Sequence, residues 1–276
     1  MGMKVVDSRL TLAFVAFACS APVDLRTSPL SPGARVRSSV SFNLDAPNAR
    51  TRGVTFALSL RGIHTYELKV VAVEAGSPTR VEETILTCSD TWAVTFDGNT
   101  TREPHVCGLQ GKVVNAWVDG GVWRRELRDG QPAPEDMDLL DTIRHPLSWE
   151  ILPPQPTKPG STRELTPLEI TGVLDESLLS RTTGKLDLKL DEIKAELANL
   201  SGTLDAKVVN SGGAEFGFKG KVTASTKVGT GLARISIDAK LDAQGFESLD
   251  IRSGEFVKIA FSDAEYHELR EYSRLQ

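Results

Sequence analysis

Alternation of apolar and polar residues with a period of two dominates the C-terminal half of this 276-residue chain. The alternation is sustained over residues 216–228 and recurs over 185–191 and 234–241. This period is typical of a β-strand that packs one face and exposes the other to water. Strands of a parallel sheet are covered on both faces and read as continuous apolar runs instead. The pattern therefore predicts an antiparallel sheet with one wet face.

The N-terminal half is strand-rich as well, and a proline-rich segment separates it from the C-terminal half. Strands are predicted at residues 35–44, 54–60, 66–73, 80–87, 91–96, 112–118 and 122–127. Six of the 14 prolines fall within residues 146–167, a density typical of a linker or an extended crossover. The expected fold is mainly β, of the α+β type, with curved antiparallel sheets in two strand-rich halves. These halves are placed at 35–152 and 168–262, and the linker at 153–167.

A few short helices are expected to pack against these sheets. One is predicted at 135–144, where apolar residues recur at helical spacing. A capping box from Thr166 to Glu169 predicts a second helix over 167–174. Its apolar side is expected to consist of Leu168, Val173 and Leu174. Another capping box, at residues 262–265, predicts a short polar C-terminal helix over 263–276. Turns are expected at 211–213 and 242–245.

The N-terminus predicts export. Lys4 and Arg9 precede a nine-residue apolar run over residues 10–18, which ends directly before Cys19. A short positive segment followed by such a run is typical of a signal peptide, assigned here to residues 1–18. As a helix the run would span about 14 Å, which is too short to cross a bilayer. Two other interpretations remain: a cleavage site for soluble secretion at 16–18, and a buried helix of a cytoplasmic protein.

Residues 16–19 resemble the lipobox of bacterial lipoproteins, whose cysteine is acylated and becomes the new N-terminus. The resemblance implies lipidation of Cys19 and a membrane anchor in the bacterial envelope, on the periplasmic side or at the cell surface. Residues 19–34 contain three prolines and are predicted to be a flexible tether between the anchor and the folded body.

The predicted export determines what oxidation state is expected for the two remaining cysteines. Cys88 and Cys107 lie 19 residues apart and flank a predicted strand. In an oxidising compartment they are expected to form a disulfide. A pair of buried thiols is the alternative.

Three stretches combine strands with characteristic turn residues: the Asp–Gly hairpin near 114–127, the proline-rich segment 152–163 and the closing hairpin 231–256. In these stretches the chain resembles a family of exported bacterial lipoproteins that is defined only as a domain of unknown function. The family usually has tryptophan where this chain has Arg163. The resemblance implies an exported lipoprotein over most of the mature chain, and it supplies no catalytic residues to transfer.

Composition and motifs argue against several classes of protein. A net charge of −5 without a basic tail argues against a nucleic-acid partner. Neither a cofactor nor a metal site is expected, because the histidines show no repeated ligand spacing. They are His64, His105, His145 and His267. The sequence also lacks the G-x-S-x-G turn of serine hydrolases and a phosphate-binding loop.

The leading functional hypothesis is a non-enzymatic binding or interaction module, anchored by its N-terminal lipid, with a lipid or an envelope protein as partner. The first alternative is a carrier that holds an apolar ligand or lipid in a concave sheet. Its candidate ligand face comprises Phe216, Phe218, Ile235 and Ile237. A less favoured alternative is an envelope hydrolase that combines His64, His105 and His145 with carboxylates. The four tryptophans are interpreted as core residues, with a stacking platform for a ligand as the alternative.

Overall fold

A computed structural model describes residues 21–25, 30–74, 77–119, 122–132, 140, 151–153, 155–174, 181–210, 212–230, 233–250 and 255–275. Within these ranges the strands form one 12-stranded sheet. The order is β6-β5-β3-β2-β1-β12-β11-β10-β9-β8-β7, with β4 paired to β3. Every strand pair is antiparallel. The mainly β, antiparallel prediction is confirmed.

The elements have the following bounds. The N-terminal half holds β1 (Arg35–Thr51), β2 (Val54–Glu74), β3 (Ser77–Phe96), β4 (Asn99–Val106), β5 (Val113–Asp119) and β6 (Val122–Leu127). The C-terminal half holds β7 (Thr162–Glu164), α2 (Pro167–Leu174), β8 (Arg181–Lys194), β9 (Leu197–Val209), β10 (Glu215–Lys227), β11 (Ala233–Asp250) and β12 (Glu255–Leu275).

The two strand-rich halves share this sheet, because the first strand pairs with the last. β1 lies between β2 and β12, with Arg35 opposite Leu275 and Leu44 opposite Tyr266. Each half therefore forms one wing, and β1–β12 is the seam between the wings.

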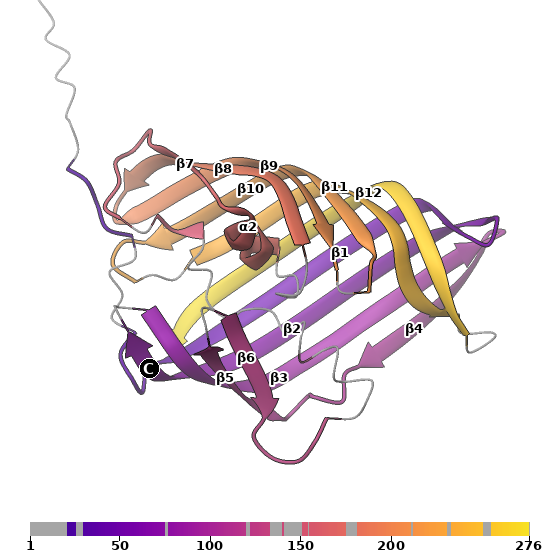
Figure 1. Cartoon of the computed structure of the whole chain (residues 1–276), viewed down its shortest axis with the longest axis horizontal. Coiled ribbons are helices and arrows are strands. Elements are labelled where there is room, and N and C mark those ends of the chain that lie inside the picture. Colours follow the sequence, from indigo (N-terminus) through magenta and orange to yellow (C-terminus); the bar gives the residue numbers. More distant parts are fainter. Residues whose placement is uncertain are drawn as a thin grey trace, which may run out of the picture.

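The sheet is strongly curved, and Figure 1 shows it as an arch with α2 on the concave side. We call the face toward α2 the inner face and the other the outer face. Bulges interrupt the register in β1 between Ala46 and Ala49 and in β11 between Leu241 and Phe246. The predicted turn at 242–245 is wrong: β11 runs through it, and Gly245, with φ 71°, lies in the bulge. Glycine suits this site because a bulge needs a left-handed residue and sharpens the local bend.

The predicted C-terminal helix is also wrong, because residues 263–275 belong to β12. Burial alternates along this strand, from Val257 and Ile259 to Tyr266, Glu268 and Arg270. A capping box is a local signal, and here pairing with β1 and β11 on both sides outweighs it. The sequence pattern did not reveal this strand, because the charged residues Glu268 and Arg270 stand at inward positions where apolar residues are expected.

The helix predicted from the first capping box is confirmed as α2. The Glu169 carboxylate accepts hydrogen bonds from the Thr166 backbone N–H and hydroxyl, 2.8 Å and 3.1 Å away. The buried residues of α2 are Ile170, Thr171, Val173 and Leu174. Leu168, expected on the apolar side, is 60% exposed. The helix predicted at 135–144 lies outside the described residues except for Leu140, which is helical and buried.

The segment predicted as a flexible tether is docked where the structure describes it. Val23 forms an isolated antiparallel bridge with Thr157, and Leu25 has no exposed surface. Leu30 is buried as well. The signal peptide and Cys19 lie outside the described residues. The proline-rich linker is an extended crossover along the inner side, and the core residues Ile151, Leu152 and Leu165 border or belong to it.

Three apolar clusters fill the inner face. The main core joins α2 and the crossover to β8–β12 and reaches Leu44 and Leu58 of the other wing. A second cluster surrounds the Cys88–Cys107 disulfide, and a third contains Leu30. Because the main core spans both wings, they form one folding unit.

Candidate ligand-binding surfaces of the sheet

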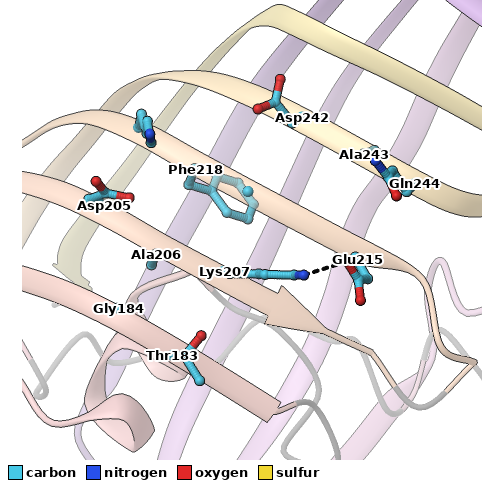
Figure 2. Close-up of a pocket in the computed structure, with 12 residues that line it drawn as sticks. Thr183, Gly184, Asp205, Ala206, Lys207, Glu215, Phe218, Asp242, Ala243 and Gln244 are labelled. Carbon is cyan, nitrogen blue, oxygen red and sulfur yellow. Dashed lines mark ion pairs between the residues drawn. The ribbon is translucent and has the colours of Figure 1, made fainter.

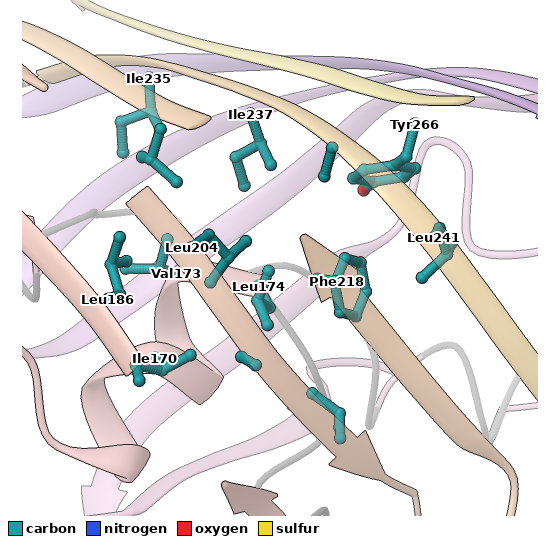
Figure 3. Packing of buried hydrophobic residues seen from close by; sticks show 14 of the residues in the cluster. Ile170, Val173, Leu174, Leu186, Leu204, Phe218, Ile235, Ile237, Leu241 and Tyr266 are labelled. Atoms are coloured by element: carbon teal, nitrogen blue, oxygen red, sulfur yellow. The ribbon is translucent and has the colours of Figure 1, made fainter. Parts of the chain in front are cut away.

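The predicted apolar ligand face lies on the inner face, where most of it is covered. Phe218, Ile235 and Ile237 are buried in the main core, and Phe216 is half-buried against it. Figure 3 shows Ile170, Val173 and Leu174 of α2 on the same side as these sheet residues. The helix and the crossover thus occupy the surface that the sequence assigned to a ligand.

A half-buried group of aromatic rings lies farther along the inner face. The rings of Trp92 and Phe246 stack with centroids 5.9 Å apart, and Phe216 meets Phe246 edge-on at 6.1 Å. Trp92 belongs to β3 and Phe246 to β11, strands separated in the sheet by β2, β1 and β12. The curvature therefore brings the two wings into contact across the concave side. We call Phe56, Trp92, Phe216 and Phe246 the inner aromatic patch, since each is half-buried against the main core.

His64 of β2 lies on the inner face of the sheet. Its Nε2 lies 2.9 Å from Oδ1 of Asp90 on β3, and its ring meets Phe42 of β1 edge-on at 5.5 Å. Gly62 lies between these groups, and any side chain there would overlap the Phe42 ring and the Asp90 carboxylate. A residue without a side chain is thus required for Phe42 to cover the sheet at this point.

A buried charge pair lies beside these residues on β12. The Arg270 Nε donates to the Glu268 carboxylate, which also accepts from the Tyr266 hydroxyl. The other end of the Arg270 guanidinium donates to the Val173 backbone oxygen of α2, 2.6 Å away. Carbonyls in the last turn of a helix lack helical partners, and a cation there also complements the helix dipole. This pair fixes α2 to the seam of the sheet.

The histidines are distributed over both faces. His64 faces inward, whereas His267 is exposed on the outer face, with Nδ1 2.7 Å from Asp238. The backbone of His105 lies opposite Asp90, and His145 lies outside the described residues. Among the described residues no three His, Cys, Asp or Glu side chains could together hold a metal ion.

A polar groove of about 340 Å³ lies on the sheet near Gly217 of β10. Gly217 presents no side chain, and its register partners are Lys207 of β9 and Asp242 of β11. Figure 2 shows the ion pair of Lys207 with Glu215 at this groove. Charges of both signs make the groove a poor match for an apolar ligand.

The predicted disulfide is confirmed. Cys88 of β3 and Cys107, which follows β4, form it with Cα atoms 5.6 Å apart. Both residues are buried, and the Cys107 backbone N–H donates to the Cys88 oxygen at 3.0 Å. The bridge ties the end of β4 to the middle of β3.

The sequence reasoning missed the inner aromatic patch and the clusters around His64 and Arg270. The contact between Trp92 and Phe246 depends on the curvature of the whole sheet, which no local pattern encodes. A usable signal existed at Gly62 and His64, because a glycine and a histidine stand at inward positions of a strand. Such interruptions of an apolar face indicate close packing or a polar cluster.

Comparison with known proteins gives a single distant likeness. No family model and no curated protein matches the sequence. Among solved structures, the chain is similar to one titled "Lipid-protein interactions in lipovitellin", with 11% identity and a TM-score of 0.41. The match covers 88% of this chain and 25% of the other, so the chain spans about a quarter of the length of that protein. Within the described residues no helix is long and apolar enough to cross a membrane.

Proposed function

We propose that the chain is an exported bacterial lipoprotein, anchored through acylated Cys19, that binds an apolar ligand non-enzymatically on its inner face. The likeness of residues 16–19 to a lipobox supports the anchor, and the three stretches near 114–127, 152–163 and 231–256 support the lipoprotein family. A disulfide between Cys88 and Cys107 fits an exported protein, since such bridges persist in oxidising compartments.

The observation that carries the binding role is the inner aromatic patch. Phe56, Trp92, Phe216 and Phe246 keep part of their surface exposed on the face that α2 and the crossover cover elsewhere. Apolar sites with large aromatic rings suit acyl chains, and half-buried rings gain from further burial. In this proposal the two curved wings of the sheet act as walls of the binding site, with α2 packed against them.

The non-enzymatic part of the proposal is supported by the surroundings of His64. Cys88 is the residue opposite His64 on β3, and as half of a disulfide it supplies no thiolate nucleophile. Asp90 and Phe42 occupy two further sides of the imidazole. An envelope hydrolase remains the second candidate, favoured by the His64–Asp90 contact, which resembles the base and orienting carboxylate of hydrolytic sites.

Titration of a fluorescent fatty acid into delipidated mature protein tests the binding role. We expect saturable binding that weakens severalfold in Trp92→Leu and in Phe246→Leu, which keep apolar volume but remove the stacked rings. Ile63→Ala is the matched control, because Ile63 is exposed on the outer face. Absence of binding by the wild-type protein, or equal binding by all four proteins, would refute the role.

A further inference from the structure

The docked N-terminal segment restricts how the folded body can lie relative to its anchor. Val23 and Thr157 exchange two backbone hydrogen bonds of 2.8 Å and 2.9 Å. Leu25, two residues later, is fully buried in the main core. The chain is therefore held against the crossover at Val23 and in the main core at Leu25, so only the residues before Val23 can act as a tether.

That tether is short. Cys19 precedes Val23 by four residues, and an extended chain spans at most about 3.3–3.6 Å per residue. A lipidated Cys19 thus keeps Val23 within about 14 Å of the membrane surface. This distance is well below the length of the longest strands, β2 and β12, whose 21 residues span about 70 Å, so the part of the arch that carries Val23 must lie next to the membrane.

Hydrogen bonds identify that end. The Gly160 N–H donates to Leu190 near the end of β8, which places the Thr157 loop beside the turn between β8 and β9. The Val228 N–H donates to the Glu196 oxygen and joins the β10–β11 turn to the same edge. In Figure 1 the indigo segment of residues 21–25 lies at this end of the arch.

The side chains at this end suit a bilayer surface. We call Lys158, residues 194–197 and residues 227–230 the rim. Leu197 is 43% exposed, an unusual position for leucine at a polar turn. Lys158, Lys194 and Lys227 are exposed around it. Glu196 is the acidic residue of the rim and lies 3.6 Å from Lys227, so the rim carries a net charge of 3 − 1 = +2.

We infer that the rim rests on the bilayer that holds the Cys19 lipid, with Leu197 at the interface and the lysines against anionic headgroups. Lysines near a membrane are attracted by its negative surface potential, and an apolar side chain between them gains by leaving water. The opposite end of the arch then projects away from the membrane. This inference rests on the proposed lipidation of Cys19.

The β9 hairpins supply a matched pair of positions for a test. Leu197 begins β9 at the rim, and Gly212 lies in the turn that follows β9. β9 spans 13 residues, so the two positions are about 40 Å apart. Gly212 has no positive φ, and a side chain there would make only ordinary contacts, so it accepts a cysteine.

Full-length lipidated Leu197→Cys and Gly212→Cys proteins are labelled with an environment-sensitive fluorophore and placed in phosphatidylethanolamine–phosphatidylglycerol vesicles. The introduced cysteine is the reactive thiol, because Cys88 and Cys107 are bridged and Cys19 would be acylated. With brominated lipids we expect quenching at least threefold stronger at 197 than at 212. Vesicle flotation of the same proteins measures the anchor itself.

The two measurements separate the two claims. Proteins that float but show equal quenching, or stronger quenching at 212, overturn the orientation and leave the anchor intact. Proteins that do not float overturn both, because the short tether then has no lipid at its end. A Lys158→Gln/Lys194→Gln/Lys227→Gln variant should float with weaker quenching at 197 than its parent; unchanged quenching would contradict the role of the lysines.

Discussion

Arg270 of β12 donates a hydrogen bond to the backbone oxygen of Val173, 97 residues earlier in α2. The Arg270 side chain is only 2% exposed, and its guanidinium also pairs with Glu268. One side chain thus links the centre of the sheet to the helix that covers the inner face. The link makes the placement of α2 dependent on a charge pair rather than on apolar contacts alone.

Removal of Arg270 should be strongly destabilising. Arg270→Met leaves the Glu268 carboxylate as an uncompensated buried charge, which costs about 3–5 kcal/mol. Urea unfolding followed by circular dichroism measures the change. The double variant Glu268→Leu/Arg270→Met is the control and should recover most of the loss, because it removes both charges. A single variant within 1 kcal/mol of the wild type would contradict a buried, paired Arg270.

The docked N-terminal segment should contribute to stability. Leu25→Ala removes a fully buried side chain and should lower the unfolding free energy by about 2–5 kcal/mol. Leu168→Ala is the matched control, since Leu168 is mostly exposed and should change the value by about 0.5 kcal/mol or less. Equal effects in urea unfolding would mean that residues 21–25 do not pack on the core in solution.

Membrane attachment should depend on one cysteine. Cys19→Ala removes the proposed acylation site, so the protein should leave the membrane fraction after cell disruption. Detergent partitioning and immunoblotting of both fractions measure this. The Cys88→Ala/Cys107→Ala variant is the control and should remain with the membrane. Unchanged partitioning of Cys19→Ala would show that the anchor lies elsewhere.

Reduction of the disulfide should lower stability. A bridge across 19 residues contributes about 3 kcal/mol through restriction of the unfolded chain. Dithiothreitol should therefore lower the urea midpoint of the wild-type protein. The Cys88→Ala/Cys107→Ala variant should unfold at the same midpoint with and without reductant. A wild-type midpoint that is insensitive to complete reduction would contradict a stabilising bridge.

Acid should weaken the contact between β1 and β2. Hydrogen bonds from Arg37 and then Arg35 hold the pKa of Glu67 below its usual range. Because the pKa is lower in the folded state, the stabilisation is present above about pH 4.3 and is lost as pH falls through the folded-state pKa. Both arginines are about half exposed, so the loss should be at most about 1 kcal/mol. In urea unfolding between pH 5 and pH 3, the unfolding free energy of Glu67→Gln should fall less with acid than that of the wild type. An identical fall in both proteins would contradict the contribution of Glu67.

The parts of the fold that sequence reasoning found are those with local causes. β6 has its predicted bounds because Asp119 and the following glycines favour a tight hairpin. α2 begins at Pro167 as predicted because Thr166 and Glu169 satisfy backbone N–H groups at its start. In both cases residues within a few positions of the element decide the outcome.

The parts that it missed depend on partners distant in sequence. The residues after Ser262 extend β12 because β1 and β11 flank them, although their own capping box favours a helix. Separate strands were predicted for 54–60 and 66–73, yet β2 is continuous because Gly62 and His64 pair with β1 on one side and with β3 on the other. Trp92 was assigned to a core, and its contact with Phe246 follows only from the arch.

The pairing of β1 with β12 also determines when the protein can finish folding. Within each wing most neighbouring strands are consecutive in the chain, so they can form hairpins as soon as both strands have been synthesised. The seam joins residues separated by more than 200 positions, for example Arg35 and Leu275, and closing such a loop is slow. Until β12 is in place, β1 and β11 each have an unpaired edge that favours aggregation. The 21 residues of β12 therefore act as the closing strand of the whole sheet, and a chain cut before them would leave an unpaired strand edge on each wing.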